Sequence, residues 1–480
     1  MAAETAAALP AVAPSGLRRD CLTFWEVVAQ SVANIAPTAT PALIIPLVFA
    51  STGNGTWLAY GVATAALLLV AVNINQFARR SASPGALYTF VAQGLGPSWG
   101  VTSGWSLVIA YLFTGGATLC GAANYAGVLL RSIAPVDVGL GVTFAAMIVT
   151  AIGAWYVAYK DIELSTRFML FIEFISVGLI VLLALIFLGK SGRAIDAQQL
   201  RLAGLTPDGL RQGLVLAIFS FVGFESATAL GHEAKDPLRS IPRSVLVTVI
   251  VVGAFFTLMS YALVDAFRGV PTSLGQSNAP LSTLAQVTGI PVFGVVIAAC
   301  AAVGFFACAL ACINAGARVI FAMARHGMIH ASAGVTHARH ATPHVAVTIA
   351  SIVVFAAPVG LLLAKFALLD VFGYLGSIAT FGFLFAYVLV SVAAPIYLRR
   401  RAEPSALAWV IGALSLVLLA FPIVGSVYPV PPPPQNYLPY VFLALLAAGI
   451  ARLVYVRART PSVIADIERD LEIAVSPETS

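Results

Sequence analysis

Long apolar stretches separated by short polar segments run along almost the whole 480-residue chain. A helix needs about 20 mainly apolar residues to cross the hydrocarbon core of a bilayer. Twelve stretches reach or approach that length, so we predict an all-α integral membrane protein with about twelve transmembrane helices. The spans are expected at residues 24–50, 56–78, 101–130, 139–158, 164–188, 208–231, 242–267, 281–313, 344–364, 368–397, 405–427 and 437–456.

The composition supports a lipid environment and argues against a soluble domain. Hydrophobic residues make up 60% of the chain and charged residues 10%, and the mean hydropathy is +0.95. A soluble domain carries roughly 25% charged residues, so this much apolar surface cannot be buried in one soluble core. Residues 1–16 lack the basic start and apolar core of a cleavable signal peptide.

The distribution of basic residues predicts that both termini lie in the cytoplasm. An even number of spans puts the two termini on the same side of the membrane. If that side is cytoplasmic, 19 of the 26 Lys and Arg residues lie at or beyond the cytoplasmic helix ends. This asymmetry accounts for the net charge of +6 without a nucleic-acid partner, and we expect a multi-pass protein of the plasma membrane.

Few acidic side chains fall inside the predicted spans. Of the 20 acidic residues, only Glu173 in span 5 and Glu225 in span 6 lie well inside, while Glu26 lies at the edge of span 1. Ionisable groups at membrane depth are costly and mostly functional. Each internal carboxylate could instead form a structural hydrogen bond to a neighbouring helix.

Two spans carry residues that interrupt a helix. Span 1 reads SVANIAPTATPALIIP over Ser31–Pro46, and its three prolines remove backbone donors close to Asn34, Thr38 and Thr40. Span 6 places Gly223 between aromatic residues and directly before Glu225. Irregular backbone at membrane depth is tolerated where protein or a cavity satisfies it, so we expect discontinuous helices rather than simple kinks.

The two interruptions are five spans apart and run in opposite directions. They are therefore equivalent elements of two inverted five-helix units, which is typical of secondary transporters. Free N–H groups at a half-helix N-terminus suit a carboxylate, while unwound carbonyls and an internal carboxylate suit an ammonium group. The arrangement favours a zwitterionic amino acid as the transported solute.

Three stretches of the sequence resemble the amino acid–polyamine–organocation (APC) superfamily of permeases. They are FSFVGFESATALGHEAKDPLRSIPRS at Phe219–Ser244, SASPGALYTFVAQGLGPSWGVTSGW at Ser81–Trp105, and NAGARVIFAMARHGMI at Asn314–Ile329. The resemblance implies a 5+5 inverted-repeat (LeuT-like) core with two peripheral helices. The expected parts are a cytoplasmic tail at 1–23, repeats at 24–190 and 207–398, peripheral helices at 405–457, and a second cytoplasmic tail at 458–480.

The same resemblance implies that the broken parts of spans 1 and 6 contact the substrate. Phe219 matches the position of an aromatic gate, and Glu225 matches an acidic position just after the break. The implied substrate-binding residues are Ala33, Asn34, Ile35, Ala36, Thr38, Phe219, Phe221, Gly223, Phe224 and Glu225.

Two departures from the family pattern leave the substrate and the coupling ion open. Where many members have a Gly-Ser-Gly type run in span 1, this chain has none between Gly16 and Gly53, so the substrate cannot be carried over. Where some proton-coupled members carry a Lys in span 5, this chain has Ser176. Sodium is poorly supported, because Phe305–Ala317 of span 8 offers no Ser or Thr hydroxyl. The coupling candidates are Glu173, Ser176 and Glu225, and we hypothesise proton symport, with ion-independent exchange as the alternative.

We expect the partners to be a small-molecule substrate, the lipid bilayer and protons, with no cofactor, no metal and no nucleic acid. Five histidines crowd the loop between spans 8 and 9 at spacings that match no metal-site pattern, so we expect a solvated cytoplasmic loop. The alternatives to an amino acid permease are an amine or polyamine carrier, an amino acid exchanger, a channel, or a transporter-derived sensor. No nucleophile–base pair or phosphate loop suggests an enzyme.

Overall fold

The computed structural model describes residues 17, 19–83, 85–133, 139–160, 162–192, 195–460, 463 and 467. Nearly all of these residues belong to helices or to the turns between them, and an isolated bridge pairs Leu22 with Ala234. Most of the two predicted cytoplasmic tails lies outside the described residues. The α-helices are α1 (Phe24–Ile35), α2 (Ile45–Thr52), α3 (Thr56–Ala78), α4 (Leu87–Leu95), α5 (Pro97–Ile133), α6 (Leu140–Lys160), α7 (Ile162–Ser191), α8 (Ala197–Leu200), α9 (Pro207–Phe219), α10 (Pro237–Ala266), α11 (Pro280–Val287), α12 (Pro291–Arg325), α13 (His344–Leu363), α14 (Leu368–Arg400), α15 (Ala406–Gly425) and α16 (Leu438–Arg459). A π-helix, η1 (Thr40–Ile44), and the 3₁₀ helices η2 (Gly53–Gly55), η3 (Ser226–Leu230), η4 (Leu274–Gln276), η5 (Ala331–Gly334) and η6 (Gln435–Tyr437) complete the set.

The predicted fold class is confirmed: the described chain is an all-α membrane protein with many spans. Ten helical stretches are long and apolar enough to cross a membrane. The first of them, Phe24–Ala78, contains predicted spans 1 and 2 because only a short turn joins α2 to α3. The predicted sixth span is not among the ten, because its helix α9 stops after 13 residues.

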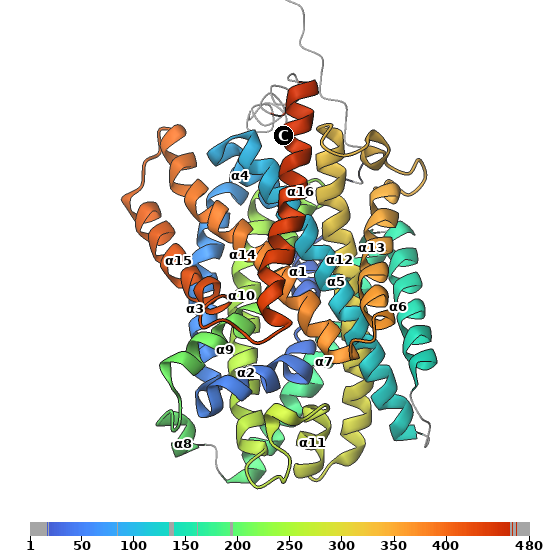
Figure 1. Ribbon diagram of the computed structural model, residues 1–480, viewed down its shortest axis with the longest axis vertical. Coiled ribbons are helices and arrows are strands. Elements are labelled where there is room, and N and C mark those ends of the chain that lie inside the picture. Colours follow the sequence, from blue (N-terminus) through green and yellow to red (C-terminus); the bar gives the residue numbers. More distant parts are fainter. Residues whose placement is uncertain are drawn as a thin grey trace, which may run out of the picture.

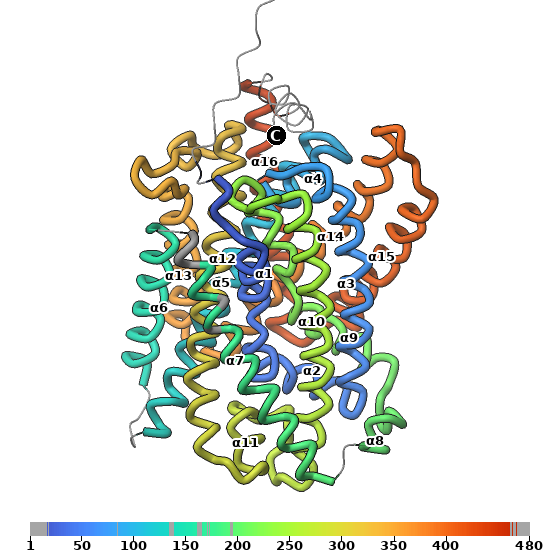
Figure 2. The backbone as a smooth tube through the Cα atoms, turned by 180° about the vertical axis from the view of Figure 1, so that it is seen from behind, coloured from blue at the N-terminus to red at the C-terminus, as the bar shows by residue number. Residues whose placement is uncertain are grey.

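The helices form one bundle (Figure 1). Its central and peripheral members differ sharply in burial. In the apolar 18-residue stretch of α5, 94% of the residues are buried inside the protein. In the corresponding stretch of α6, 22% are buried. Figure 2 shows α1 near the middle of the bundle, with α6 and α15 at opposite edges. A helix whose apolar side chains are left uncovered by protein suits contact with lipid tails. The central position of α1 surrounds its interrupted end with other helices.

Some predicted boundaries are wrong. Span 8 was expected at 281–313, but the structure divides this region into α11 and the long helix α12, which begins at Pro291. The separation falls where Gly289 takes a φ of +81° and Pro291 starts the next helix. Proline is favoured in the first helical turn, which explains why α12 begins there. The limits of the two repeats and of the peripheral helices stay predictions.

The loop between α12 and α13 is exposed at residues such as His330 and Arg339, and it also packs on α6. His337, His340 and His344 surround the ring of Tyr159 on α6, with ring centroids 5.4, 6.1 and 5.9 Å away. Thr342 of the same loop donates a hydrogen bond of 2.8 Å to the backbone carbonyl of Tyr159. The histidines therefore help to pack this loop on α6. Among the described residues, no group of three or more His, Cys, Asp or Glu side chains could hold a metal ion.

Candidate functional site

The first helix of the chain is interrupted as predicted. Helix α1 ends at Ile35, and Ala36 takes a left-handed conformation with φ 51° before Pro37. The chain resumes as η1 and then α2. Residues that precede proline avoid the helical region, and Pro37 has no N–H to continue the ladder, so the sequence stops the helix at this point. Two of the last carbonyls of α1 accept hydrogen bonds from outside the regular helical ladder, that of Ala33 from the Ala36 amide and that of Asn34 from the Cys308 thiol.

The second interruption lies in predicted span 6. Helix α9 ends at Phe219, residues 220–225 form turns, and η3 continues the span as a 3₁₀ helix. Gly223 has a φ of +91°, a conformation that other residues rarely adopt. A side chain at this position would also collide with its surroundings, because an added Cβ would lie 1.7 Å from Nδ2 of Asn34.

The two interruptions therefore touch each other. Besides the contact of Gly223 with Asn34, the Ser226 hydroxyl donates to the Gln30 carbonyl at 3.2 Å. The Ala227 amide donates to the Ser31 hydroxyl at 3.1 Å. Inverted five-helix units are expected to meet at their broken helices in this way.

Glu225 is fully buried and is held by two tyrosines from other helices. Its Oε1 accepts a hydrogen bond of 2.7 Å from Tyr111 of α5, and its Oε2 accepts one of 2.5 Å from Tyr387 of α14. The Tyr387 hydroxyl in turn accepts a hydrogen bond of 3.3 Å from the Gly223 amide. The carboxylate thus links the second break to two central helices, as the structural alternative for this residue anticipated.

A small enclosed cavity lies beside the breaks. Its volume is about 20 Å³, which is roughly the space of one water molecule. Four of the predicted substrate-binding residues line it, namely Asn34, Ile35, Ala36 and Phe219. Sequence reasoning missed the other lining residues, which are Ala39, Ile44, Thr114, Ala117, Thr118, Val222, Cys308 and Phe372.

The remaining predicted residues do not line this cavity. Phe221 packs edge-on against Phe256 of α10 at a centroid distance of 5.0 Å, and Phe224 packs on Tyr387 at 5.3 Å. Thr38 contacts Gly304 of α12, where an added Cβ would lie 2.0 Å from its hydroxyl oxygen. The other predicted residues that do not line the cavity are Ala33, Gly223 and Glu225.

Two polar side chains that line the cavity have unsatisfied hydrogen-bonding atoms. Within the described part of the chain, neither Nδ2 nor Oδ1 of Asn34 has a hydrogen-bond partner, and the same holds for Oγ1 of Thr114. Asn34 is 1% exposed and Thr114 is 4% exposed. Leaving a buried polar group unpaired costs about 1–3 kcal/mol. A polar ligand that forms hydrogen bonds to these groups would therefore remove much of this free-energy cost.

Aromatic rings close one side of the cavity. Phe219 meets Phe372 of α14 edge-on at 6.3 Å, and Phe372 meets Phe305 of α12 at 6.2 Å. Gly376 makes room for the first ring, because a Cβ there would lie 2.4 Å from the Phe219 ring. The position of Phe219 fits the predicted gate, but its movement stays a prediction.

The coupling candidates of span 5 lie together on α7, away from the cavity lining. Glu173 is 3% exposed, and neither of its carboxylate oxygens has a hydrogen-bond partner among the described residues. Ser176, one turn further along α7, is 2% exposed and hydrogen-bonds with the Cys300 thiol of α12. Glu173 thus faces the interior of the bundle, whereas its neighbour Phe174 is 80% exposed.

Sequence reasoning missed a buried ion pair near the predicted cytoplasmic ends of spans 6 and 8. Arg318 of α12 donates to both carboxylate oxygens of Glu233 at 2.6 and 2.7 Å, and each side chain is 1% exposed. The backbone carbonyl of Glu233 also accepts hydrogen bonds from the amides of Cys21 and Leu22, just before α1. A second pair joins Glu26 of α1 to Arg167 of α7 at 2.6 Å.

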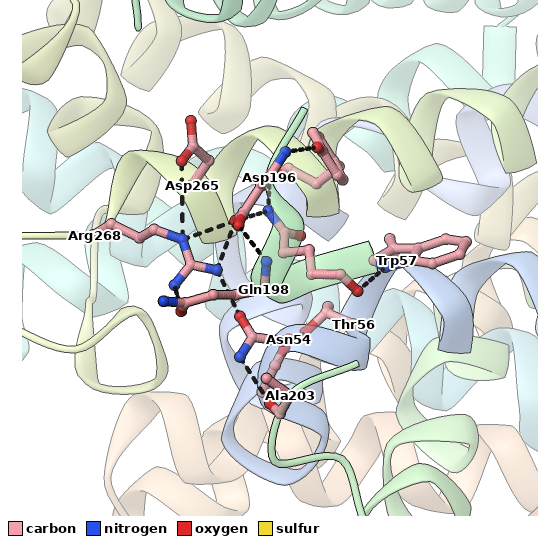
Figure 3. Close-up of polar contacts among 11 residues, drawn as sticks. Asn54, Thr56, Trp57, Asp196, Gln198, Ala203, Asp265 and Arg268 are labelled. Atoms are coloured by element: carbon pink, nitrogen blue, oxygen red, sulfur yellow. Dashed lines mark hydrogen bonds and ion pairs between the residues drawn. The ribbon is translucent and has the colours of Figure 1, made fainter. Parts of the chain in front are cut away.

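A polar network at the opposite end of the bundle joins three segments that are distant in sequence (Figure 3). Arg268, just after α10, donates to Asp196 at 2.7 Å, to Gln198 at 2.6 Å and to Asn54 at 2.7 Å. Burial by itself would raise the pKa of the Asp196 carboxyl, but hydrogen bonds from Gln199 and Arg268 bring it below its usual value. The ionised carboxylate therefore stabilises the folded protein above the pKa of the unfolded chain, and acidification removes this contribution.

Comparisons with known proteins agree with this architecture. Residues 26–456 match the amino acid permease family. The chain is 26% identical to the branched-chain amino acid permease BcaP of Bacillus subtilis over 73% of this chain and 74% of the relative. It is 25% identical to the low-affinity putrescine importer PlaP of Escherichia coli over 80% of this chain and 82% of that protein. It is 24% identical to human cationic amino acid transporter 4 over 81% of this chain and 61% of that protein. Because the family match extends over most of the sequence and confirms the resemblance found there, the chain belongs to the amino acid permease family and is a transporter rather than an enzyme.

Proposed function

We propose that this protein carries an amino acid across the plasma membrane by alternating access, with the solute bound between the two interrupted spans. The observation that supports this most strongly is the buried Asn34 amide, whose donor and acceptor are both unsatisfied beside the cavity. An amide can receive an ammonium group at its oxygen and a carboxylate at its nitrogen. The terminal carbonyls of α1 add partial negative charge that suits the ammonium group.

The cavity must enlarge before it can hold such a solute. Its present volume of about 20 Å³ is far below the several hundred that ligand pockets offer. The ring of Phe219 and the two helical halves of span 1 are the elements that border the cavity and could move. This requirement supports a transporter that passes through a closed state, rather than a channel with a continuous path.

The relatives support a solute with an amino group but differ in its charge. Their names specify branched-chain amino acids, cationic amino acids and putrescine. An amine or polyamine carrier is therefore the second candidate. Competition by an amino acid against its decarboxylated analogue separates the two, because only the amino acid offers a carboxylate to the Asn34 amide.

Matched variants on α5 test the location of the site. Thr114 has an unsatisfied hydroxyl, whereas the hydroxyl of Thr118 already donates to the Gly115 carbonyl at 2.9 Å. Both side chains line the cavity. Loss of one hydrogen bond to the solute should raise KM about 3- to 10-fold in Thr114→Val, with little change in Thr118→Val. Equal effects of the two substitutions on uptake by proteoliposomes would contradict the proposed site.

Proton symport through Glu173 is the coupling scheme that we propose. Its carboxylate is buried without a hydrogen-bond partner among the described residues, while that of Glu225 is held by Tyr111 and Tyr387. A carboxylate that lies in the protein interior without a bound cation can take up and release a proton as its surroundings change. Separate pH and sodium gradients imposed on proteoliposomes distinguish proton symport, sodium symport and ion-independent exchange.

Both termini are proposed to be cytoplasmic, on the strength of the basic-residue asymmetry in the sequence. The test is to label single cysteines with a membrane-impermeant thiol reagent in intact cells. A cysteine placed in the loop around Arg339 should stay unlabelled, while one placed near Gln198 should react. The reverse pattern would overturn the orientation.

A further inference from the structure

The lining of the cavity carries an inference about the solute itself, which rests on the proposed function and makes it more specific. We infer that the site selects neutral amino acids with small, apolar side chains over cationic amino acids and diamines. The argument uses the charge of the lining, the position of the nearest carboxylate and the rings that limit the space.

None of the lining residues carries a formal charge within the described part of the chain. The polar members are Asn34, Thr114, Thr118 and Cys308, and all the others are Ala, Val, Ile or Phe. The Cys308 thiol already donates to the Asn34 carbonyl at 3.2 Å. Two polar groups, the Asn34 amide and the Thr114 hydroxyl, therefore offer unsatisfied atoms, and these suit the ammonium and carboxylate that every amino acid shares.

A second positive charge on the solute would find no counter-charge in this lining. Glu225, which follows the second interruption, does not line the cavity, and both of its oxygens accept hydrogen bonds from tyrosine hydroxyls. The two tyrosines that hold this carboxylate, Tyr111 and Tyr387, are themselves fully buried. A buried charge without a counter-charge is strongly unfavourable, because burial removes hydration that the protein does not replace.

The size limit comes from the aromatic side of the cavity. The Phe219 ring lies against Gly376 so closely that an added Cβ would sit 2.4 Å from it. The ring therefore cannot retreat further toward α14. Phe372, which meets it edge-on, is itself backed by Phe305. A solute side chain that shares this space must be apolar and compact.

The test uses the purified full-length protein in proteoliposomes. Uptake and counterflow of labelled leucine are measured, with valine, alanine, lysine, glutamate and putrescine as unlabelled competitors. We expect valine and alanine to compete, and lysine, glutamate and putrescine to be about 30-fold weaker or more, as expected for an unpaired buried charge. Inhibition by lysine or putrescine within threefold of that by valine would overturn the inference and leave amino-group transport intact. Absence of saturable counterflow for leucine, lysine and putrescine, in protein that remains monodisperse, would instead overturn the proposed function.

A pair of glycine variants tests the size limit independently. In Gly376→Ala the new methyl group displaces the Phe219 ring, so KM should rise at least about threefold more for leucine than for alanine. Gly373→Ala is the matched control one turn away on α14, because a Cβ there meets nothing within 4 Å. Equal changes for leucine and alanine in Gly376→Ala would overturn the role of the ring in selecting side-chain size.

Discussion

Replacing Gly223 with Ala should disable the site by two mechanisms that can be separated. The residue has a φ of +91°, and an added Cβ would lie 1.7 Å from Nδ2 of Asn34. The backbone conformation costs about 1–3 kcal/mol for a residue other than glycine. The collision adds about 1–3 kcal/mol of overpacking, because the Asn34 amide must move to admit the methyl group. Only the second mechanism displaces the group that we propose to bind the solute.

Gly289→Ala is the matched control, because Gly289 has a φ of +81° with nothing within 4 Å of an added Cβ. Both variants should lose thermal stability in detergent, and Gly223→Ala should lose more. Uptake by proteoliposomes should keep its KM in Gly289→Ala, whereas in Gly223→Ala we expect KM to rise about tenfold or transport to be lost. If Gly223→Ala transports with an unchanged KM and loses no more stability than the control, the contact with Asn34 plays no part in binding.

Three further predictions concern groups outside the cavity. In Glu173→Gln, a pH gradient should no longer drive accumulation while counterflow continues, and gradient-driven accumulation at the normal level would contradict coupling at this residue. Arg318→Ala should destabilise the protein by about 3–5 kcal/mol in unfolding measurements because it strands buried Glu233, whereas the double variant Arg318→Met/Glu233→Gln should recover most of that loss. Because its folded-state pKa is lowered, Asp196 should lose its stabilising effect as pH falls below the usual Asp pKa of about 3.9, and in Asp196→Asn the melting temperature should change less over that acidic range.

The fold was largely predictable because lipid imposes a simple requirement on the sequence. Any crossing needs a long apolar helix, and the chain shows these stretches directly. The same reasoning failed at span 8 because residues 281–290 are also apolar enough to read as membrane-spanning. Only the backbone shows that α11 ends before Gly289 and that α12 starts at Pro291.

The two interruptions at the candidate site were predictable for a comparable reason. Pro37 and Gly223 mark the interruptions because both residues alter the backbone itself. The cavity-lining residues of α5, α12 and α14 give no such signal in the sequence, because Thr114, Cys308 and Phe372 are ordinary residues of apolar helices. Their role follows from which helices lie beside the breaks, and this depends on packing that no local pattern records.

Glu233 shows how the same limit affects charged residues. In the sequence it follows span 6 within a polar run and looks solvated, yet in the structure it is buried against Arg318. The intact Glu-Ala-Lys motif and the Arg of span 8 both belong to the stretches that resemble the family. Their pairing was a possible signal, because a basic residue inside a span needs an acidic partner.

The polar contacts at the two ends of the bundle constrain how the cavity could open. At the predicted cytoplasmic end, Glu233 and Glu26 join the segments around the interrupted spans to α12 and α7, so opening there must break or carry along two ion pairs. At the other end, Arg268 joins the turn after α2, the segment before α9 and the end of α10 to one another. Among these contacts, Arg268 makes none to α5, α12 or α14, the helices that supply the opposite wall. At the end that carries the Arg268 network, the interrupted spans could therefore separate from that wall without breaking the network. At the predicted cytoplasmic end, the buried pair of Glu233 with Arg318 must break or move with the opening. Release of the solute should therefore meet a greater obstacle at the predicted cytoplasmic end than at the other end.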